Sequence, residues 1–75
     1  MKITSKSDSE DIRVYIDDIL HIRIPRDKNI WLHSWIEGHS KKYMVKIHTK
    51  KHTDLFEYDN KKLWVDILTQ FEKIL

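Results

Sequence analysis

The histidines and the adjacent aspartates of this 75-residue chain are the side chains whose chemistry could define a functional site. His48 and His52 are four residues apart, a spacing that suits zinc ligation when both residues lie on a helix. The local pattern instead places them at a strand end and in a turn, and Lys46 beside His33 would repel a cation. We therefore expect no metal site and no cofactor.

Asp17 and Asp18 are adjacent, and neighbouring residues of a strand point to opposite faces of a sheet. This spacing argues against a pair of carboxylates acting as general acid and base, and it favours a turn or a β-bulge. The sequence contains a single glycine, which excludes a glycine-rich phosphate loop, and no cysteine. We therefore predict that the chain is not an enzyme and has no small-molecule substrate.

A larger group of side chains indicates binding. Residues 12–24, 29–37 and 43–50 alternate between apolar and other residues with period two, as strands with one buried face do. When these segments are folded against each other, one face of the sheet is aliphatic. The opposite face carries Tyr15, Ile19, His21, Arg23, Trp31, His33, Trp35, Met44, Lys46 and His48.

This second face is too aromatic for ordinary solvated surface. Because Trp, Tyr and Met are enriched at interfaces, we predict that it contacts a protein partner or a second copy of the chain, forming a homodimer. Two alternatives stay open. The aromatic residues could simply pack across the strands of a two-sided sheet, or they could stack on nucleic-acid bases, with help from the lysine pairs at 41–42, 50–51 and 61–62.

Turn signals divide the first half of the chain. Residues 1–10 are polar and rich in serine, so we expect a flexible polar arm before a single domain over residues 11–75. Asp17-Asp18 marks a bulge or a break in the long first segment, which Pro25 ends because proline cannot donate to a ladder. Residues 26–28 are expected to form a polar loop.

The second half begins with a hairpin. Its loop is expected at residues 38–41, with a positive φ at Gly38. A further turn near residues 51–52 leads to a short strand at 55–58, whose inward side chains we expect to be Phe56 and Tyr58.

The alternation also predicts a register, because a slip of one residue would move every apolar side chain to the wrong face. For the hairpin around residues 38–41, the predicted pairs are Trp31–His48, Leu32–Ile47, His33–Lys46, Trp35–Met44, Ile36–Tyr43 and Glu37–Lys42. For a first turn at 25–29, they are Ile19–Trp35, His21–His33, Ile22–Leu32 and Ile24–Ile30.

The C-terminal segment is predicted to be an amphipathic helix capped by Asp59 or Asn60. Its apolar stripe consists of Leu63, Trp64, Ile67, Leu68, Phe71, Ile74 and Leu75. We therefore predict an α+β fold, an antiparallel β-meander of three or four strands with one C-terminal α-helix packed on its aliphatic face.

The overall composition sets weaker limits. The formal net charge is +2, divided as −1 over residues 1–37 and +3 over residues 38–75, which permits weak contact with nucleic acid without requiring it. No apolar run approaches the roughly 20 residues needed to span a bilayer. The polar N-terminal segment lacks the apolar stretch of a signal peptide. We expect a cytoplasmic protein with no membrane contact.

Overall fold

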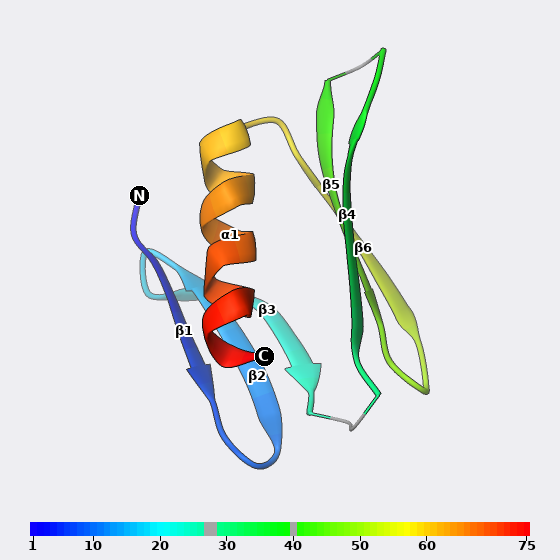
Figure 1. Ribbon diagram of the computed structural model, residues 1–75. Coiled ribbons are helices and arrows are strands. Elements are labelled where there is room, and N and C mark those ends of the chain that lie inside the picture. Colours follow the sequence, from blue (N-terminus) through cyan, green and yellow to red (C-terminus); the bar gives the residue numbers. More distant parts are fainter. Residues whose placement is uncertain (27–28, 40) are drawn as a thin grey trace. The chain divides into compact units, whose positions relative to one another are not determined.

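The computed structural model describes residues 1–26, 29–39 and 41–75, and over these residues the chain forms six strands and one helix (Figure 1). The strands form two antiparallel three-stranded sheets, ordered β1-β2-β3 and β4-β5-β6. Contacts divide the chain into two compact units, Met1–Arg26 with Val65–Leu75, and Asp27–Trp64. The predicted α+β class is confirmed, with two short meanders in place of one.

The first unit contains β1 (Ile3–Ser7), β2 (Asp11–Ile16) and β3 (Ile19–Pro25). A two-residue turn at Asp17-Asp18 joins β2 to β3, and both residues have positive φ, 49° and 66°. Positive φ at both central positions is the feature of the type I′ turn, whose twist matches that of a hairpin. The predicted break at the two aspartates is therefore present.

β1 lies within residues 1–10, which the sequence suggested would be a flexible arm. The strand is polar because its inward side chains include Ser5 and Ser7, which pair with Val14 and Ile12 of β2. The helix supplies a polar partner, since Ser5 Oγ donates to Gln70 Oε1 at 2.9 Å and Gln70 Nε2 donates to the Ile3 carbonyl at 3.2 Å. Such a contact across 65 residues leaves no local signal in the sequence.

A register shift in β3 changes which side chains share a face. Val14 pairs with Ile22, but Tyr15 pairs with Leu20, so His21 is the extra residue of a β-bulge. Beyond the shift, Ile19 pairs with Ile16 of the aliphatic face. The prediction that Ile19 shares a face with Tyr15 is therefore wrong, because strict alternation does not allow for a bulge.

The second unit contains β4 (Trp31–Glu37), β5 (Lys42–His48) and β6 (Thr53–Tyr58). All six predicted β4–β5 pairs are confirmed. The predicted pairs between β3 and β4 are wrong, because these strands belong to different sheets. The matching alternation of β3 and β4 shows that each strand has one apolar face. It does not show that the two strands belong to one sheet.

One detail of the loops also differs from expectation. Among the described residues of the β4–β5 loop, the positive φ lies at Lys41, with φ of 49°, and not at Gly38. Asp27, Lys28 and Ser40, which the sequence places in loops, lie outside the described residues. The inward residues of β6 are as predicted, since Tyr58 is buried and Phe56 is half-buried.

The helix α1 spans Lys61–Ile74, and Asn60 caps it by accepting a hydrogen bond from the Leu63 amide at 3.2 Å. Its C-terminal part lies against the aliphatic face of β1-β2-β3, as Figure 1 shows. The buried core of this unit consists of Ile12, Val14, Ile22, Ile24, Ile67 and Phe71. Within the described residues, no helix is long and apolar enough to cross a membrane.

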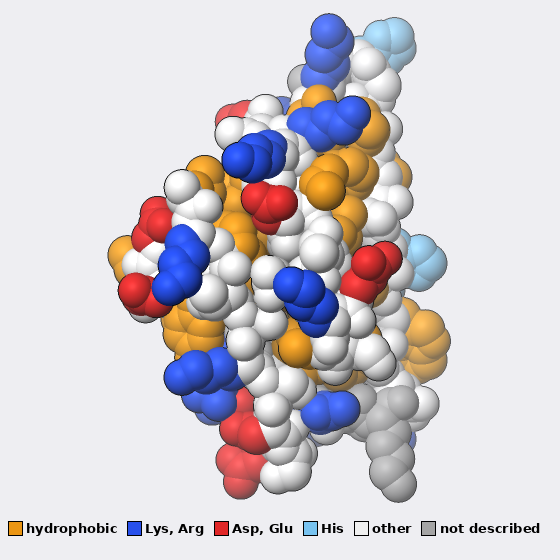
Figure 2. All heavy atoms as spheres, turned by 60° about the vertical axis from the view of Figure 1, so that its left-hand side comes forward, with side chains coloured by type: hydrophobic (Ala, Val, Ile, Leu, Met, Phe, Trp, Pro, Cys, Tyr) orange, Lys and Arg blue, Asp and Glu red, His pale blue; other side chains and the backbone are white. Residues whose placement is uncertain are grey.

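Charged side chains of both signs are spread over the surface seen in Figure 2. Lys and Arg side chains lie apart from one another, with Asp, Glu and hydrophobic side chains between them.

The Asp17-Asp18 turn gives the first prediction. Asp18 adopts φ of 66°, a left-handed conformation that costs an L-residue about 1 kcal/mol relative to glycine. Asp18→Gly should therefore raise the free energy of unfolding by about 0.5–1 kcal/mol, measured by urea denaturation. Asp18→Ala, which keeps the Cβ atom, should give no such gain. Equal stability of the glycine and alanine variants would contradict the turn assignment.

Candidate functional site

The ten residues predicted to form one face are divided between the two sheets. Four lie on β2 and β3, namely Tyr15, Ile19, His21 and Arg23. Six lie on β4 and β5, namely Trp31, His33, Trp35, Met44, Lys46 and His48. Because the sheets are separate, the predicted rows that cross from β3 to β4 do not form.

The six residues on β4 and β5 do share a face. Residues opposite each other in an antiparallel ladder project to the same side of a sheet, so the register defines three rows. The rows are Trp35–Met44–Glu57, His33–Lys46–Leu55 and Trp31–His48–Thr53. With Glu37 and Lys42, which pair at the end of the ladder, these residues form what we call the aromatic face.

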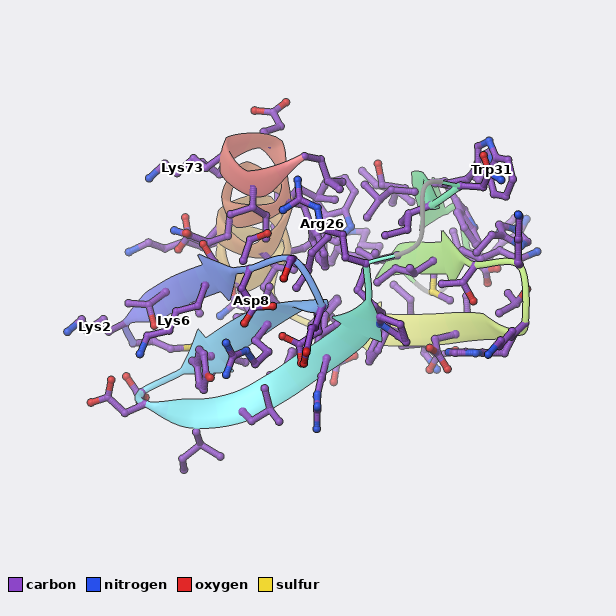
Figure 3. The ribbon with its side chains drawn as sticks, turned by 90° about the horizontal axis from the view of Figure 1, so that it is seen from below. Lys2, Lys6, Asp8, Arg26, Trp31 and Lys73 are labelled. Carbon is purple, nitrogen blue, oxygen red and sulfur yellow. The ribbon has the colours of Figure 1, made fainter. Side chains whose placement is uncertain are left out.

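The aromatic face presents large apolar side chains to solvent. Trp31 is 53% exposed, Leu55 55% and Trp35 36%. Figure 3 shows Trp31 extending beyond the ribbon of β4. Met44 differs, because it is only 2% exposed on the central strand, where Trp35 and Glu57 are its cross-strand neighbours. Met44 is therefore a core residue, and its assignment to the contact surface is wrong.

The polar residues of the aromatic face contact one another. The His33 and His48 rings lie 5.7 Å apart, edge to face at 85°. His48 Nδ1 is 2.9 Å from Thr53 Oγ1, and Lys42 Nζ lies 3.5 Å from Glu57 Oε2. These contacts hold part of the aromatic face in place.

The sequence did not identify Leu55 as a member of this face. Its place follows from the β5–β6 register, in which Lys46 pairs with Leu55. The short strand around Leu55 carried too weak an alternation to fix that register in advance. Only a longer alternation of apolar and polar residues around Leu55 would have predicted its place on this face from the sequence.

Tyr15 and Arg23 lie on the polar side of β1-β2-β3 and have other uses there. Tyr15 lines a solvent-open hollow of about 250 Å³ with Thr4, Lys6 and Asp18. Arg23 Nε donates to Asp11 Oδ2 at 2.7 Å, so its charge is engaged within the chain. His21 is the extra residue of the bulge, and desolvation lowers the pKa of its ring.

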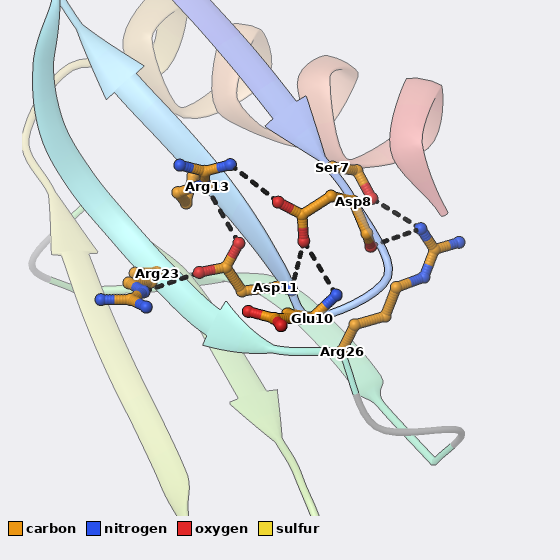
Figure 4. A network of polar contacts seen from close by, with 7 residues as sticks. All are labelled: Ser7, Asp8, Glu10, Asp11, Arg13, Arg23 and Arg26. Atoms are coloured by element: carbon orange, nitrogen blue, oxygen red, sulfur yellow. Dashed lines mark hydrogen bonds and ion pairs between the residues drawn. The ribbon is translucent and has the colours of Figure 1, made fainter.

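Figure 4 shows the polar network to which Arg23 belongs. Asp11 is 8% exposed, and its carboxylate lies between the guanidinium groups of Arg13 and Arg23. Arg13 Nε is 3.1 Å from Asp11 Oδ1, close enough for an ion pair but not aligned as a hydrogen bond. Arg13 Nη2 also reaches Asp8 Oδ2 at 3.0 Å. Burying this carboxylate requires such partners, so we assign the network to structure.

On the β5–β6 turn, Thr49, His52 and Asp54 place a hydroxyl, an imidazole and a carboxylate in a row, the order of the groups in a catalytic triad. Thr49 Oγ1 is 3.4 Å from His52 Nδ1, and His52 Nε2 is 3.2 Å from Asp54 Oδ2. The hydroxyl, however, is held in the turn, since it donates to the His52 carbonyl and accepts from the His52 amide at 3.2 Å. These contacts are those of a Thr turn, in which the hydroxyl braces the backbone. Among the described residues, no cluster of three or more metal-ligating side chains forms.

No protein-family model, curated protein or solved structure matches this chain.

The polar network gives a prediction about pH. Backbone hydrogen bonds from the Asp11 and Glu10 amides to Asp8 Oδ1, with the nearby charges of Arg13 and Arg23, hold the pKa of Asp8 below its ordinary value of 3.8. A lowered pKa means that the folded state favours the ionised carboxylate. Asp8 therefore contributes stability above about pH 4, and this contribution is lost as the pH falls through the lowered pKa.

We expect an NMR titration of the folded protein to give a midpoint for Asp8 below 3.8. Asp8→Asn should be less stable than the wild type at pH 7, and the difference should shrink as the solution is acidified. Asp8→Ser, which keeps an oxygen acceptor for the two amides, should be more stable at pH 7 than Asp8→Ala. A titration midpoint at or above 3.8 would contradict this assignment.

Proposed function

We propose that this chain is a small non-catalytic interaction module that binds protein, either a different chain or a second copy of itself, through the aromatic face. The observation that supports the proposal is the exposure of Trp31, Trp35 and Leu55 on one side of a single sheet. Tryptophans of this kind are the side chains that most often dominate the binding energy of protein interfaces.

The charge of the aromatic face favours a protein over a nucleic acid. Its formal charges are Lys42 and Lys46 against Glu37 and Glu57, so they cancel when its histidines are neutral. Lys42 is also paired with Glu57. A surface that binds phosphates needs an excess of positive charge, which this face lacks.

Weak nucleic-acid binding by the same face is the second candidate. It is supported by the lysines that flank the two ends of β5, Lys41-Lys42 and Lys50-Lys51, next to aromatic side chains on which bases could stack. Salt separates the candidates, because phosphate contacts weaken steeply as salt rises and an aromatic protein interface does not. The cytoplasmic location expected from the sequence stays a prediction.

The proposal predicts the effect of removing the exposed indoles. Trp31→Ala with Trp35→Ala should weaken association at least tenfold, because each replacement removes a large apolar contact at an interface. Self-association would be measured by sedimentation velocity over a wide concentration range, in 50 mM and 300 mM salt. Binding of a single-stranded oligonucleotide would be measured by fluorescence anisotropy at the same two salt concentrations.

The third tryptophan provides a folding control. Trp64 Nε1 donates to the Met44 carbonyl at 3.0 Å and its ring lies 5.4 Å from that of Tyr43, so its emission reports the folded sheet once the other indoles are gone. Val65→Ala, at a 43% exposed position on α1, is the matched apolar truncation and should leave association unchanged. If the double variant associates as the wild type does, the aromatic face is not the contact surface. Salt-sensitive oligonucleotide binding that the double variant loses would favour the second candidate.

A further inference from the structure

β4 is an open edge of its sheet. The strand order β4-β5-β6 leaves one side of β4 unpaired, and six of its seven residues are exposed. In the described part of the chain, no backbone hydrogen bond outside the β4–β5 ladder involves residues of β4. An edge of this kind presents a row of amides and carbonyls to which another strand can add.

The other edge strands carry features that discourage pairing. β6 contains Asp54 and Glu57, β1 contains Lys6, and β3 contains Arg23 and ends at Pro25. Charged side chains and proline are the usual protection of sheet edges. The sequence of β4 has neither lysine nor proline, and its single formal charge is Glu37 at the last position. β4 is therefore the least protected edge.

β4 is also complementary to itself. When two copies run antiparallel around a two-fold axis at Ser34, all seven residues of each strand are paired. Leu32 then lies opposite Ile36 of the second copy, His33 opposite Trp35, and Trp31 opposite Glu37. Apolar side chains meet on one face, aromatic and polar ones meet on the other, and only the small Ser34 side chains meet at the axis.

The hydrogen-bonding pattern and the charges agree with this register. Along a strand, the backbone amide and carbonyl point alternately toward one edge and the other, so two β4 residues face the same edge when their numbers are both odd or both even. Every pair in this register meets that condition, so the amides and carbonyls of both copies can hydrogen-bond across the axis. Glu37 does not face its own copy. It lies diagonally from His33 of the second copy, within reach of a long side chain.

We propose that two copies of this chain pair through β4, antiparallel and centred on Ser34, so that their β4-β5-β6 sheets form one continuous six-stranded sheet. The inference rests on the proposed function, because it names the second copy as the partner of the same sheet. Such a contact is isologous and closes on itself. The remaining edges of the joined sheet are the two β6 strands, where Asp54 and Glu57 oppose further addition.

The test places charges at the two-fold axis. Ser34 is exposed and lies on the face opposite Trp31 and Trp35, so a longer side chain there is compatible with the folded monomer and leaves the aromatic face intact. In Ser34→Lys two ammonium groups would face each other, and in Ser34→Glu two carboxylates would do so. For each variant alone, the dissociation constant of the dimer measured by sedimentation velocity should rise at least tenfold. An equimolar mixture of the two should restore the dimer.

Two controls accompany these variants. Ser34→Thr keeps a small uncharged side chain and should stay dimeric. Val65→Lys adds the same charge on α1, at a 43% exposed position outside both β4 and the aromatic face, and should also stay dimeric. Circular dichroism would show that each variant is folded.

The outcomes separate this inference from the proposed function. A wild type that stays monomeric at all concentrations overturns pairing through β4. A wild-type dimer that is unaffected in both Ser34 variants but lost on replacing Trp31 and Trp35 also overturns it, while leaving contact through the aromatic face intact. Loss of the dimer in each Ser34 variant, without recovery on mixing, would overturn the two-fold register at Ser34.

Discussion

The ladder between β4 and β5 determines where every candidate binding residue of the second unit lies. Its register places Trp31, His33 and Trp35 on one side of the sheet, and Leu32, Ser34 and Ile36 on the other. A shift of one residue would exchange the two sets. The core favours this register, because Leu32 and Ser34 lie beside the buried Ile47 and Val45, where a shifted strand would place Trp31, His33 or Trp35. The exposure of the indoles is therefore a consequence of how the core of this sheet is packed.

The small size of each sheet explains why so much apolar surface stays exposed. A chain of this length cannot bury as large a fraction of its surface as a larger domain does. The described residues of the second unit bury Met44, Val45, Ile47 and Tyr58, and three of these four lie on the central strand. β4 consequently gains stability from one ladder only. A second strand along its free edge would pair the outward amides and carbonyls and cover part of Trp35 and Ile36.

The sequence predicted most of the local structure for reasons that can be named. The turn at Asp17-Asp18 and the helix cap at Asn60 are set by residues close together in the sequence, and the structure contains both. The β4–β5 register followed from a clean alternation on both strands of one hairpin. β1 could not be recognised, because its Ser5 is hydrogen-bonded to Gln70 at the other end of the chain. Long-range partners of this kind are not encoded by local periodicity.

The division of the predicted binding face has a similar cause. Alternation says which residues of a strand share a side, but not which strands share a sheet. The tight turn at Asp17-Asp18 pairs β3 with β2, and the bulge at His21 then changes the phase of Ile19. Tyr15 and Arg23 thus belong to a polar surface with its own ion pairs, and six of the ten predicted residues keep a common face.

Pairing of β4 with a second copy would be tested most directly by methyl NOEs between Leu32 and Ile36. Four residues along one strand span about 13 Å, too far for such an NOE within a single chain. In the proposed dimer the two side chains face each other across the two-fold axis. In a sample of labelled and unlabelled chains, isotope-filtered spectra should show this contact between copies. Its absence, when sedimentation shows that the dimer is populated, would contradict the account.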